Sequence, residues 1–221
     1  MKPIIILGTG GNCIDILDTI NEINLASRQS IYECVGFLDD ERDNWGKEFF
    51  GVKVLGPLET ANDHQESCFV NGIGSPFNFW RKNEILARAG IPDDRFETIV
   101  HPTASVSKMA KLGFDTVILQ QVTISSNVSI GNHVIVLPNT VISHDSSVGD
   151  FTCITGSVCI SGGTKIGKLC YLGTNSSIIG NITIGDKCLV GMGSVVLGDV
   201  EANSAVVGSP ASFLRRVTED K

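Results

Sequence analysis

The chain has 221 residues, of which 42% are hydrophobic and 19% charged, and its formal net charge is −7 at pH 7. This composition excludes a disordered chain and suits a soluble globular protein with room for one large domain or two small ones. Residues 1–100 hold 9 Lys and Arg against 16 Asp and Glu, whereas residues 101–221 hold 8 against 8, which predicts two domains. No basic stripe is present, so a nucleic-acid partner is not expected.

The chain begins with Met1-Lys2-Pro3 and the apolar run Ile4–Leu7, which is too short for the apolar core of a signal peptide. No apolar run approaches the roughly 18 residues of a membrane-spanning helix. The seven cysteines are odd in number and include no Cys-x-x-Cys pair, which favours reduced thiols over disulfides or a zinc site. We therefore expect a cytoplasmic protein without a membrane partner.

The first expected elements are a strand at Lys2–Leu7, a glycine-rich turn at Gly8–Gly11, and a helix whose apolar residues recur along one face from Ile14 to Ile23. Strand, glycine turn and helix open a mononucleotide-binding unit, in which the helix N-terminus points backbone N–H groups at a phosphate. The glycine pattern is incomplete, because position 13 is Cys13. The turn predicts a phosphate site, although not a full dinucleotide fingerprint.

A second strand is expected at Tyr32–Leu38 and ends in Asp39-Asp40. Carboxylates at this point either meet a ribose or a base edge, or form a solvated turn. The remaining elements complete a β-α-β-β-α-β domain, a small Rossmann-like α/β domain over residues 1–100: a strand at Cys68–Ile73, a helix at Phe79–Ala89 and a strand at Phe96–Val100.

From residue 104 to about 200, an aliphatic residue returns at every sixth position sixteen times, from Val106 to Val196. The residue two before each is small or β-branched. This is the hexapeptide repeat, in which one hexad makes a short strand plus a turn and three hexads close a triangular coil. The pattern predicts an all-β left-handed parallel β-helix over residues 101–214, followed by a charged tail at 215–221.

A second period of 18 residues supports the coil. Cys170 and Cys188 are 18 apart in the small inward slot, so they are expected to be core residues. Glycine follows the aliphatic residue once per coil, where the backbone turns tightly or another surface comes close: Gly113, Gly131, Gly149, Gly167 and Gly185.

Distinctive motifs lie along nearly the whole chain: the glycine turn after the first strand, Phe37-Leu-Asp-Asp40, Ile99-Val-His-Pro-Thr-Ala104, the hexads, Ile142-Ser-His-Asp-Ser-Ser-Val-Gly-Asp-Phe151 and Gly208-Ser-Pro-Ala211. With them the chain resembles the bacterial sugar O-acyltransferase family. That family includes sialic-acid O-acetyltransferases and N-acetyltransferases of nucleotide-linked 4-amino sugars, enzymes of glycan biosynthesis.

The resemblance implies a homotrimer in which acetyl-coenzyme A lies between the β-helices of neighbouring subunits, each of which is a triangular prism. It also implies that the α/β domain holds a nucleotide sugar. It implies no metal. The residues that match the family's functional positions are His144 and Asp145 for catalysis; Gly10, Gly11 and Asn12 at the phosphate turn; Asp39 and Asp40 at the nucleoside; and Cys153, Gly173, Thr174, Gly191 and Met192 at acetyl-coenzyme A.

His144 lies two residues after Ile142, at an outward position of its hexad, so it is not a core histidine. An imidazole with a pKa of about 6.5 suits the general base of acyl transfer at neutral pH and typically contributes about 10²–10⁴-fold. A carboxylate beside it, as Asp145 could be, favours the protonated ring. No Ser or Cys is placed as an acyl carrier, so we expect direct transfer in a ternary complex.

Two positions depart from the family pattern. The phosphate turn of aminosugar N-acetyltransferases usually reads Gly-His-Gly, whereas here it reads Gly11-Asn12-Cys13. Asn can donate a hydrogen bond to phosphate but carries no charge. Some family members have a second histidine where this chain has Cys153, whose thiol is a weaker donor. Any polarisation of the thioester then falls to a backbone N–H.

Two other functions fit the sequence less well. A zinc enzyme of the carbonic-anhydrase type uses three histidines on such a prism, but only His133 and His144 lie in the hexads, at a different spacing. A non-catalytic scaffold has no use for an outward His-Asp pair. If the protein is an acyltransferase, the expected reaction is N-acetylation of a nucleotide-linked 4-amino-4,6-dideoxy sugar, and the alternative is O-acetylation of a sialic-acid-like sugar. The sequence does not specify the base of the nucleotide, or whether the acyl group is acetyl or longer.

Overall fold

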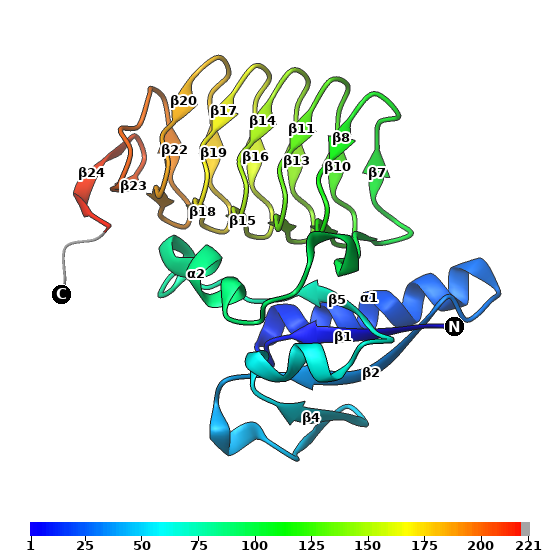
Figure 1. Ribbon diagram of the computed structural model, residues 1–221. Coiled ribbons are helices and arrows are strands. Elements are labelled where there is room, and N and C mark those ends of the chain that lie inside the picture. Colours follow the sequence, from blue (N-terminus) through cyan, green and yellow to red (C-terminus); the bar gives the residue numbers. More distant parts are fainter. Residues whose placement is uncertain (218–221) are drawn as a thin grey trace.

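The computed structural model describes residues 1–217, which form a small α/β domain followed by a long parallel β-helix (Figure 1). The elements of the α/β domain are β1 (Lys2–Leu7), α1 (Gly11–Ser27), β2 (Tyr32–Leu38), β3 (Glu48–Phe49), β4 (Val52–Gly56), β5 (Cys68–Asn71) and α2 (Lys82–Ala87). The helix expected at 79–89 is shorter in the structure, because Phe79–Arg81 forms a 3₁₀ turn that leads into α2.

The sheet of the α/β domain has the strand order β3-β4-β2-β1-β5, and all neighbours are parallel except β3 and β4. Its centre, β1, is fully buried over Ile4–Leu7, as expected for a parallel strand covered on both faces. The β3–β4 hairpin was not predicted. Its turn is Phe50-Gly51, with φ of 52° and 81°, rather than the Asn-Gly or Asp-Gly that usually marks such a hairpin.

The β-helix consists mainly of two-residue strands that start every six residues, as the hexads predict. They are β6 (Ile99–Val100), β7 (Ser105–Val106), β8 (Lys111–Leu112), β9 (Val117–Ile118), β10 (Thr123–Ile124), β11 (Ser129–Ile130), β12 (Ile135–Val136), β13 (Val141–Ile142), β14 (Ser147–Val148), β15 (Cys153–Ile154), β16 (Cys159–Ile160), β17 (Lys165–Ile166), β18 (Tyr171–Leu172), β19 (Ser177–Ile178), β20 (Thr183–Ile184), β21 (Leu189–Val190), β22 (Val195–Val196), β23 (Ser204–Gly208) and β24 (Ala211–Arg216).

Successive coils stack in parallel, so that Ile124, for example, pairs with Ile142 on the next coil. Three faces result: face 1 is β6-β9-β12-β15-β18-β21-β23-β24, face 2 is β7-β10-β13-β16-β19-β22, and face 3 is β8-β11-β14-β17-β20. We call the rows of turns between them edge 1/2, edge 2/3 and edge 3/1. The predicted α/β domain and left-handed parallel β-helix are confirmed.

Two inward residues per hexad fill the prism. The second residue of most strands, such as Val136, and the residue two before it, here Val134, are buried in one continuous core. Cys170 and Cys188 are part of this core, as predicted. Burial raises the pKa of Cys170 to about 12, so its side chain behaves as a small apolar thiol.

The turns explain two recurrent residue types. The left-handed backbone region recurs at every sixth position, for example at Asn127 (φ 57°), and Asn and Asp tolerate it better than most residues. The glycines spaced by 18 serve close approach between coils. A Cβ on Gly131 would lie 2.4 Å from Oδ1 of Asp150, and one on Gly149 would lie 2.6 Å from the backbone carbon of Gly167.

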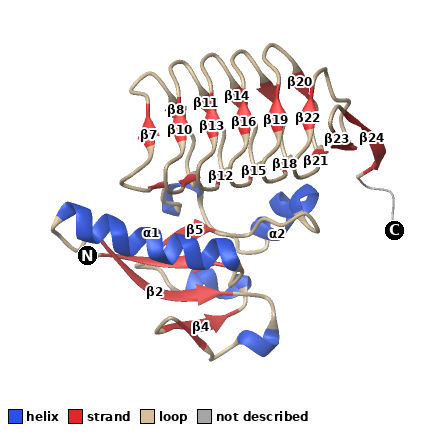
Figure 2. Ribbon diagram, turned by 180° about the vertical axis from the view of Figure 1, so that it is seen from behind, coloured by secondary structure: helices blue, strands red, loops and turns tan. Residues whose placement is uncertain are grey.

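The α/β domain docks on face 1 of the prism (Figures 1 and 2). Ile6 and Cys13 of the domain share a buried cluster with Ile135 and Cys153 of face 1. The last strand expected in the α/β domain instead belongs to face 1, because β6 pairs with β9. The chain therefore joins the prism slightly before the predicted boundary at 100/101.

The C-terminal end of the prism is closed by the antiparallel pair β23 and β24. Arg215 and Arg216 belong to β24 and Val217 is buried, so this part of the predicted tail over 215–221 is corrected. Arg216 is held in place by hydrogen bonds to Ala202 and Ser204. The rest of that tail, residues 218–221, lies outside the described residues. Within residues 1–217, no helix has the length and apolar character needed to cross a membrane.

Candidate functional site

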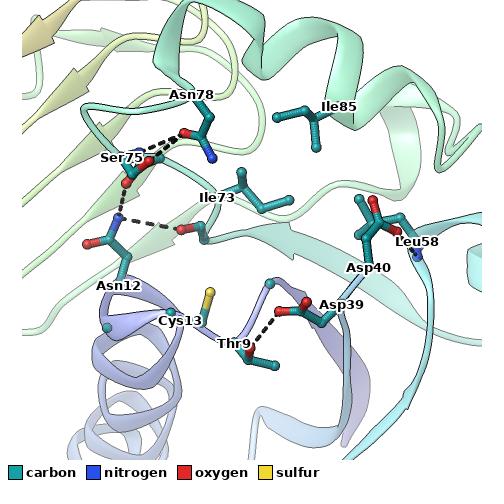
Figure 3. Close-up of a pocket in the computed structure, with 15 residues that line it drawn as sticks. Thr9, Asn12, Cys13, Asp39, Asp40, Leu58, Ile73, Ser75, Asn78 and Ile85 are labelled. Carbon is teal, nitrogen blue, oxygen red and sulfur yellow. Dashed lines mark hydrogen bonds between the residues drawn. The ribbon is translucent and has the colours of Figure 1, made fainter. Parts of the chain in front are cut away.

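The α/β domain contains a pocket of about 380 Å³ at the carboxyl ends of β1, β2 and β5 (Figure 3). Ligand sites of open parallel sheets characteristically lie at such ends. The five residues predicted to bind the sugar nucleotide all line this pocket: Gly10, Gly11, Asn12, Asp39 and Asp40.

The glycine turn forms the floor of the pocket. Gly8 has a φ of 98°, and a Cβ there would lie 2.9 Å from Sγ of Cys13. Gly10 is the N-cap of α1, whose first turn carries no acidic side chain. The free N–H groups of that turn and the positive end of the helix dipole suit an anion. Among the described residues lining the pocket there is no Lys, Arg or His, so backbone groups would have to hold a phosphate.

The two carboxylates at the end of β2 are already engaged in the pocket wall. Asp39 accepts hydrogen bonds from the Thr9 hydroxyl at 2.5 Å and from the Glu41 N–H at 2.7 Å. Asp40 accepts one from the Leu58 N–H at 3.1 Å and pairs with Arg88 at 2.9 Å. Each oxygen keeps a further lone pair, so both side chains can still accept from a hydroxyl or an N–H of a ligand.

Asn12 lies in the predicted turn, but its amide has another partner. Nδ2 donates to the carbonyl oxygen of Gly74 at 3.0 Å and approaches that of Gly72 at 3.5 Å (Figure 3). Asn12 thus ties the start of α1 to the segment after β5. Because the amide hydrogens of Asn12 face these protein acceptors, donation from its side chain to a phosphate stays a prediction.

His144 and Asp145 lie in the turn between β13 and β14, on edge 2/3. Nδ1 of His144 donates to Oδ2 of Asp145 at 2.7 Å, and Oδ1 of Asp145 accepts from Nδ2 of Asn127 at 2.7 Å. The bond from Asn127, followed by that from His144, lowers the pKa of Asp145. The two side chains are 66% and 57% exposed, so His144 points outward as its hexad position predicts.

The same turn position is glycine in the next three coils: Gly162, Gly180 and Gly198. A Cβ on Gly162 would lie 2.7 Å from Cε1 of His144, so the imidazole ring lies against the backbone of the following coil. Edge 2/3 therefore presents a strip without side chains at this position, running from His144 toward the C-terminal end of the prism.

Four of the residues predicted to contact acetyl-coenzyme A lie together on a different edge. Gly173 and Thr174 belong to the turn between β18 and β19, and Gly191 and Met192 to the turn between β21 and β22, both on edge 1/2. A Cβ on Gly173 would lie 2.6 Å from the backbone nitrogen of Met192, so the two turns stack directly. Met192 is 81% exposed.

Cys153 does not join that group. It is fully buried in β15 on face 1, where its Sγ faces Gly74 of the α/β domain. Burial raises the pKa of its thiol to about 11. The predicted contact between Cys153 and acetyl-coenzyme A is corrected, because the α/β domain covers this position of face 1, which the hexad pattern does not reveal.

His133, the other histidine of the hexads, is buried on edge 3/1. Its Nδ1 lies 2.6 Å from Oδ2 of Asp115. Because His133 and His144 occupy different edges, they cannot ligate one metal ion within a single chain. Across residues 1–217, no three His, Cys, Asp or Glu side chains form a group that could hold a metal.

Several residues of these sites were not predicted. Asn127 and Gly162 contact the His144–Asp145 pair, and the signal for them was available, since each lies one 18-residue coil from its partner. The polar pocket residues Ser75 and Asn78 had no such signal and reach the pocket only through the packing of the α/β domain. Thr9 was not singled out, although it lies within the predicted glycine turn.

Two family models match the chain. Residues 3–88 match the PglD N-terminal domain, which covers most of the α/β domain, and residues 163–198 match the bacterial transferase hexapeptide (six repeats). Among curated protein sequences, none matches the chain.

Solved structures share both domains. The acetyltransferase domain of PglB from Neisseria gonorrhoeae FA1090 has a TM-score of 0.83 at 23% identity, over 97% of this chain and 100% of that chain. PerB from Caulobacter crescentus, solved with CoA and GDP-perosamine, has a TM-score of 0.81 at 24% identity, over 96% of this chain and 97% of its own. WeeI from Acinetobacter baumannii AYE has a TM-score of 0.79 at 20% identity, over 96% and 99%.

The Neisseria domain has also been solved with acetyl coenzyme A. The likeness establishes a shared fold over almost the whole chain. Together with the two family models, it confirms the resemblance to sugar acyltransferases of the hexapeptide β-helix type.

Proposed function

Since this chain has the architecture of the hexapeptide β-helix sugar acetyltransferases, we propose that it transfers an acetyl group from acetyl-coenzyme A to a sugar. The proposed acceptor is a nucleotide-linked amino sugar of the 4-amino-4,6-dideoxy type. In this proposal residues 1–100 bind the acceptor and residues 101–214 carry out the transfer.

The hydrogen-bonded pair of His144 and Asp145 carries the proposal. Asp145 holds Nδ1–H of the ring at 2.7 Å, which leaves Nε2 as the proton acceptor of the ring. Asn127 satisfies the second oxygen of Asp145, so the carboxylate is oriented and stays ionised beside an imidazole that becomes charged. This is the arrangement that a general base requires.

In the proposed reaction the acceptor amine attacks the thioester carbonyl carbon. An N–C bond forms, the C–S bond breaks, and the products are an amide and a free thiol. Nε2 of His144 takes the proton lost by the amine and returns it to the departing sulfur. Backbone N–H groups of the coil turns would stabilise the oxyanion, since no side-chain donor is required for that role.

The proposed site needs more than one copy of the chain. His144 lies in a turn on edge 2/3, whereas the turns with Gly173, Thr174, Gly191 and Met192 lie on edge 1/2. Figure 1 shows the α/β domain on the opposite side of the prism from the turns that join β13 to β14. A homotrimer would bring edge 2/3 of one prism beside edge 1/2 of its neighbour. The strip of glycines beyond His144 leaves room there for a long, thin coenzyme arm. Exclusion of water from such a groove would strengthen the electrostatic interaction between His144 and Asp145, which are exposed in the single chain.

The pocket in the α/β domain supports a nucleotide-linked acceptor. Free N–H groups at the start of α1 suit a diphosphate, and Asp39 and Asp40 suit the hydroxyl and N–H groups of a nucleoside. PerB, which has the same fold, was solved with GDP-perosamine. These features make N-acetylation of a nucleotide amino sugar the first choice.

O-acetylation of a sialic-acid-like sugar is the second candidate, and one observation favours it. The pocket has two carboxylates and, among its described lining residues, no cationic side chain, while the Asn12 amide is committed to Gly72 and Gly74. Such a lining fits a sialic-acid-like sugar, which carries a single carboxylate, better than a diphosphate group, which carries two negative charges.

Thiol release from acetyl-coenzyme A, followed across a panel of acceptors, tests the proposal. The panel contains uridine, thymidine and guanosine diphosphate 4-amino sugars, and free sialic acid as the hydroxyl acceptor. We expect saturable release with one of the amino sugars and an N-acetylated product by mass spectrometry. Release with sialic acid alone would select the second candidate, and no release with any acceptor would contradict both.

A further inference from the structure

A buried polar cluster lies on edge 3/1, between the two domains, and the proposed reaction does not use it. Asp115 and His133 occupy the left-handed positions of two successive turns, at φ of 52° and 57°. Nδ1 of His133 donates to Oδ2 of Asp115 at 2.6 Å, and the His133 ring stacks on Phe151 with centroids 4.7 Å apart. Asp115 is fully buried, which raises the pKa of its carboxyl.

Two segments of the α/β domain reach this cluster. The N–H of Asn71, the last residue of β5, donates to Oδ1 of Asp115 at 2.8 Å. Lys82, the first residue of α2, is fully buried, and its Nζ donates to the carbonyl oxygen of His133 at 2.7 Å. Buried ionisable groups are costly unless they are partnered, so these contacts define where both segments meet the prism.

The chain between the two anchors forms one wall of the proposed acceptor pocket, which we call the 72–78 wall. Oδ1 of Asn71 accepts from the N–H of Ile73 at 2.8 Å, which shapes the turn out of β5. The carbonyl of Gly74 accepts from Asn12 at the start of α1. Hydrogen bonds therefore lead from the prism through Asn71 and the 72–78 wall to the glycine turn, and Figure 3 shows their pocket end.

We propose that Asp115, His133 and Lys82 are positioning residues that hold the 72–78 wall in the shape that binds the acceptor. They lie outside the pocket lining and act through Asn71 and α2. The identity of the ligand rests on the proposed function, whereas the anchoring of the wall does not. Acceptor binding consequently depends on an edge of the prism that contacts no substrate.

Two replacements of Asp115 separate its contacts from its backbone conformation. Asp115→Gly removes the carboxylate without straining the left-handed turn, and Asp115→Asn tolerates that turn and keeps an oxygen that can accept from the Asn71 N–H. The matched control is Lys187→Gly, because Lys187 has a φ of 56° at the same turn position four coils further on.

Amide hydrogen exchange on the full chain is the first readout. In Asp115→Gly we expect exchange over residues 71–78 to accelerate about tenfold, as loss of one anchoring hydrogen bond implies. Asp115→Asn should restore much of the protection, and Lys187→Gly should leave these residues unchanged. Unchanged exchange over 71–78 in Asp115→Gly would overturn the proposal.

Kinetics with the thiol-release assay distinguish positioning from a general loss of structure. Asp115→Gly should raise the KM for the acceptor about tenfold and leave the KM for acetyl-coenzyme A unaltered. A fall in kcat with both KM values unchanged would indicate only a smaller folded fraction and would count against positioning.

A second variant keeps the test decisive if Asp115→Gly does not fold. Lys82→Met removes the other anchor and must then accelerate exchange over 71–78. A wild-type chain that acetylates no acceptor would contradict the proposed function, while the exchange results would still decide this inference.

Discussion

The prism and the α/β domain place their functional side chains in different ways. In the prism, a residue contacts its equivalent one coil away, so Asn127 meets Asp145, and His144 lies against Gly162. In the α/β domain, the pocket is assembled from segments near residues 8–13, 39–40, 58 and 72–85, which share no period. A substitution in the prism should therefore act on adjacent coils, whereas one in the α/β domain should act through tertiary contacts.

The largest expected effect on activity comes from replacing His144, the proposed general base on edge 2/3. His144→Ala should reduce kcat by about 10²–10⁴-fold, because it removes the proton acceptor. The melting temperature should not change, since the side chain is 66% exposed. Acetyl-coenzyme A binding, measured by calorimetry, should be nearly intact.

His64→Ala, in the α/β domain, is the matched histidine control and should keep full activity. If His144→Ala also kept full activity, the chemistry could not be assigned to edge 2/3.

The interface between the two regions should show a distinct pH dependence. Burial lowers the pKa of Lys82 to about 8, below its ordinary value of 10.5. Between these values the unfolded chain keeps a proton that the folded chain has lost, so rising pH stabilises the fold. The free energy of unfolding of the wild type, relative to Lys82→Met, should increase by up to about 3 kcal/mol across this window.

Urea unfolding of both proteins at pH 7.5 and pH 10 measures this difference. Parallel changes in the two proteins would mean that Lys82 does not enter the folded state as a desolvated amine.

Close stacking of coils predicts a smaller effect on stability. Gly131→Ala should lower the free energy of unfolding by about 1–3 kcal/mol, because the new Cβ meets the backbone and side chain of Asp150. Gly198→Ala is the control, since a Cβ there has nothing within 4 Å. Equal stability of the two variants, in chemical denaturation, would contradict the stacking explanation for the repeated glycines.

The smallest expected effect comes from replacing Gly162, which should lower activity without changing stability. Gly162→Ala places a Cβ 2.7 Å from the His144 ring, which is a movable side chain rather than backbone. The ring should shift, and kcat should fall about tenfold through loss of alignment. Thermal stability should match the wild type. A clear loss of stability would show that Gly162 is needed by the coil rather than by His144.

Several predictions from the sequence were confirmed in the prism and corrected at its boundary. The inward direction of Cys170 and Cys188 follows from the hexad and is observed. Cys153 occupies an outward position and is nevertheless buried, because the α/β domain covers face 1. The repeat specifies which way a side chain points from its coil, but not what packs against it.

The α/β domain shows the same limit more strongly. The glycine turn and Asp39-Asp40 were predicted to meet and do line one pocket. The 72–78 wall was not predicted, because it is positioned by Asp115 and Lys82, residues that have no motif in common. The β3–β4 hairpin was missed because its turn residues are atypical.

The sequence by itself determined the prism, the coil length and the outward direction of His144, because aliphatic residues with a strict six-residue period are all buried together only in such a coil. Tertiary structure alone decided which face the α/β domain covers, how the 72–78 wall closes the pocket, and that His144 and Gly173 lie on different edges. These features arise from contacts between segments that no repeat relates, so their partners cannot be read from spacing.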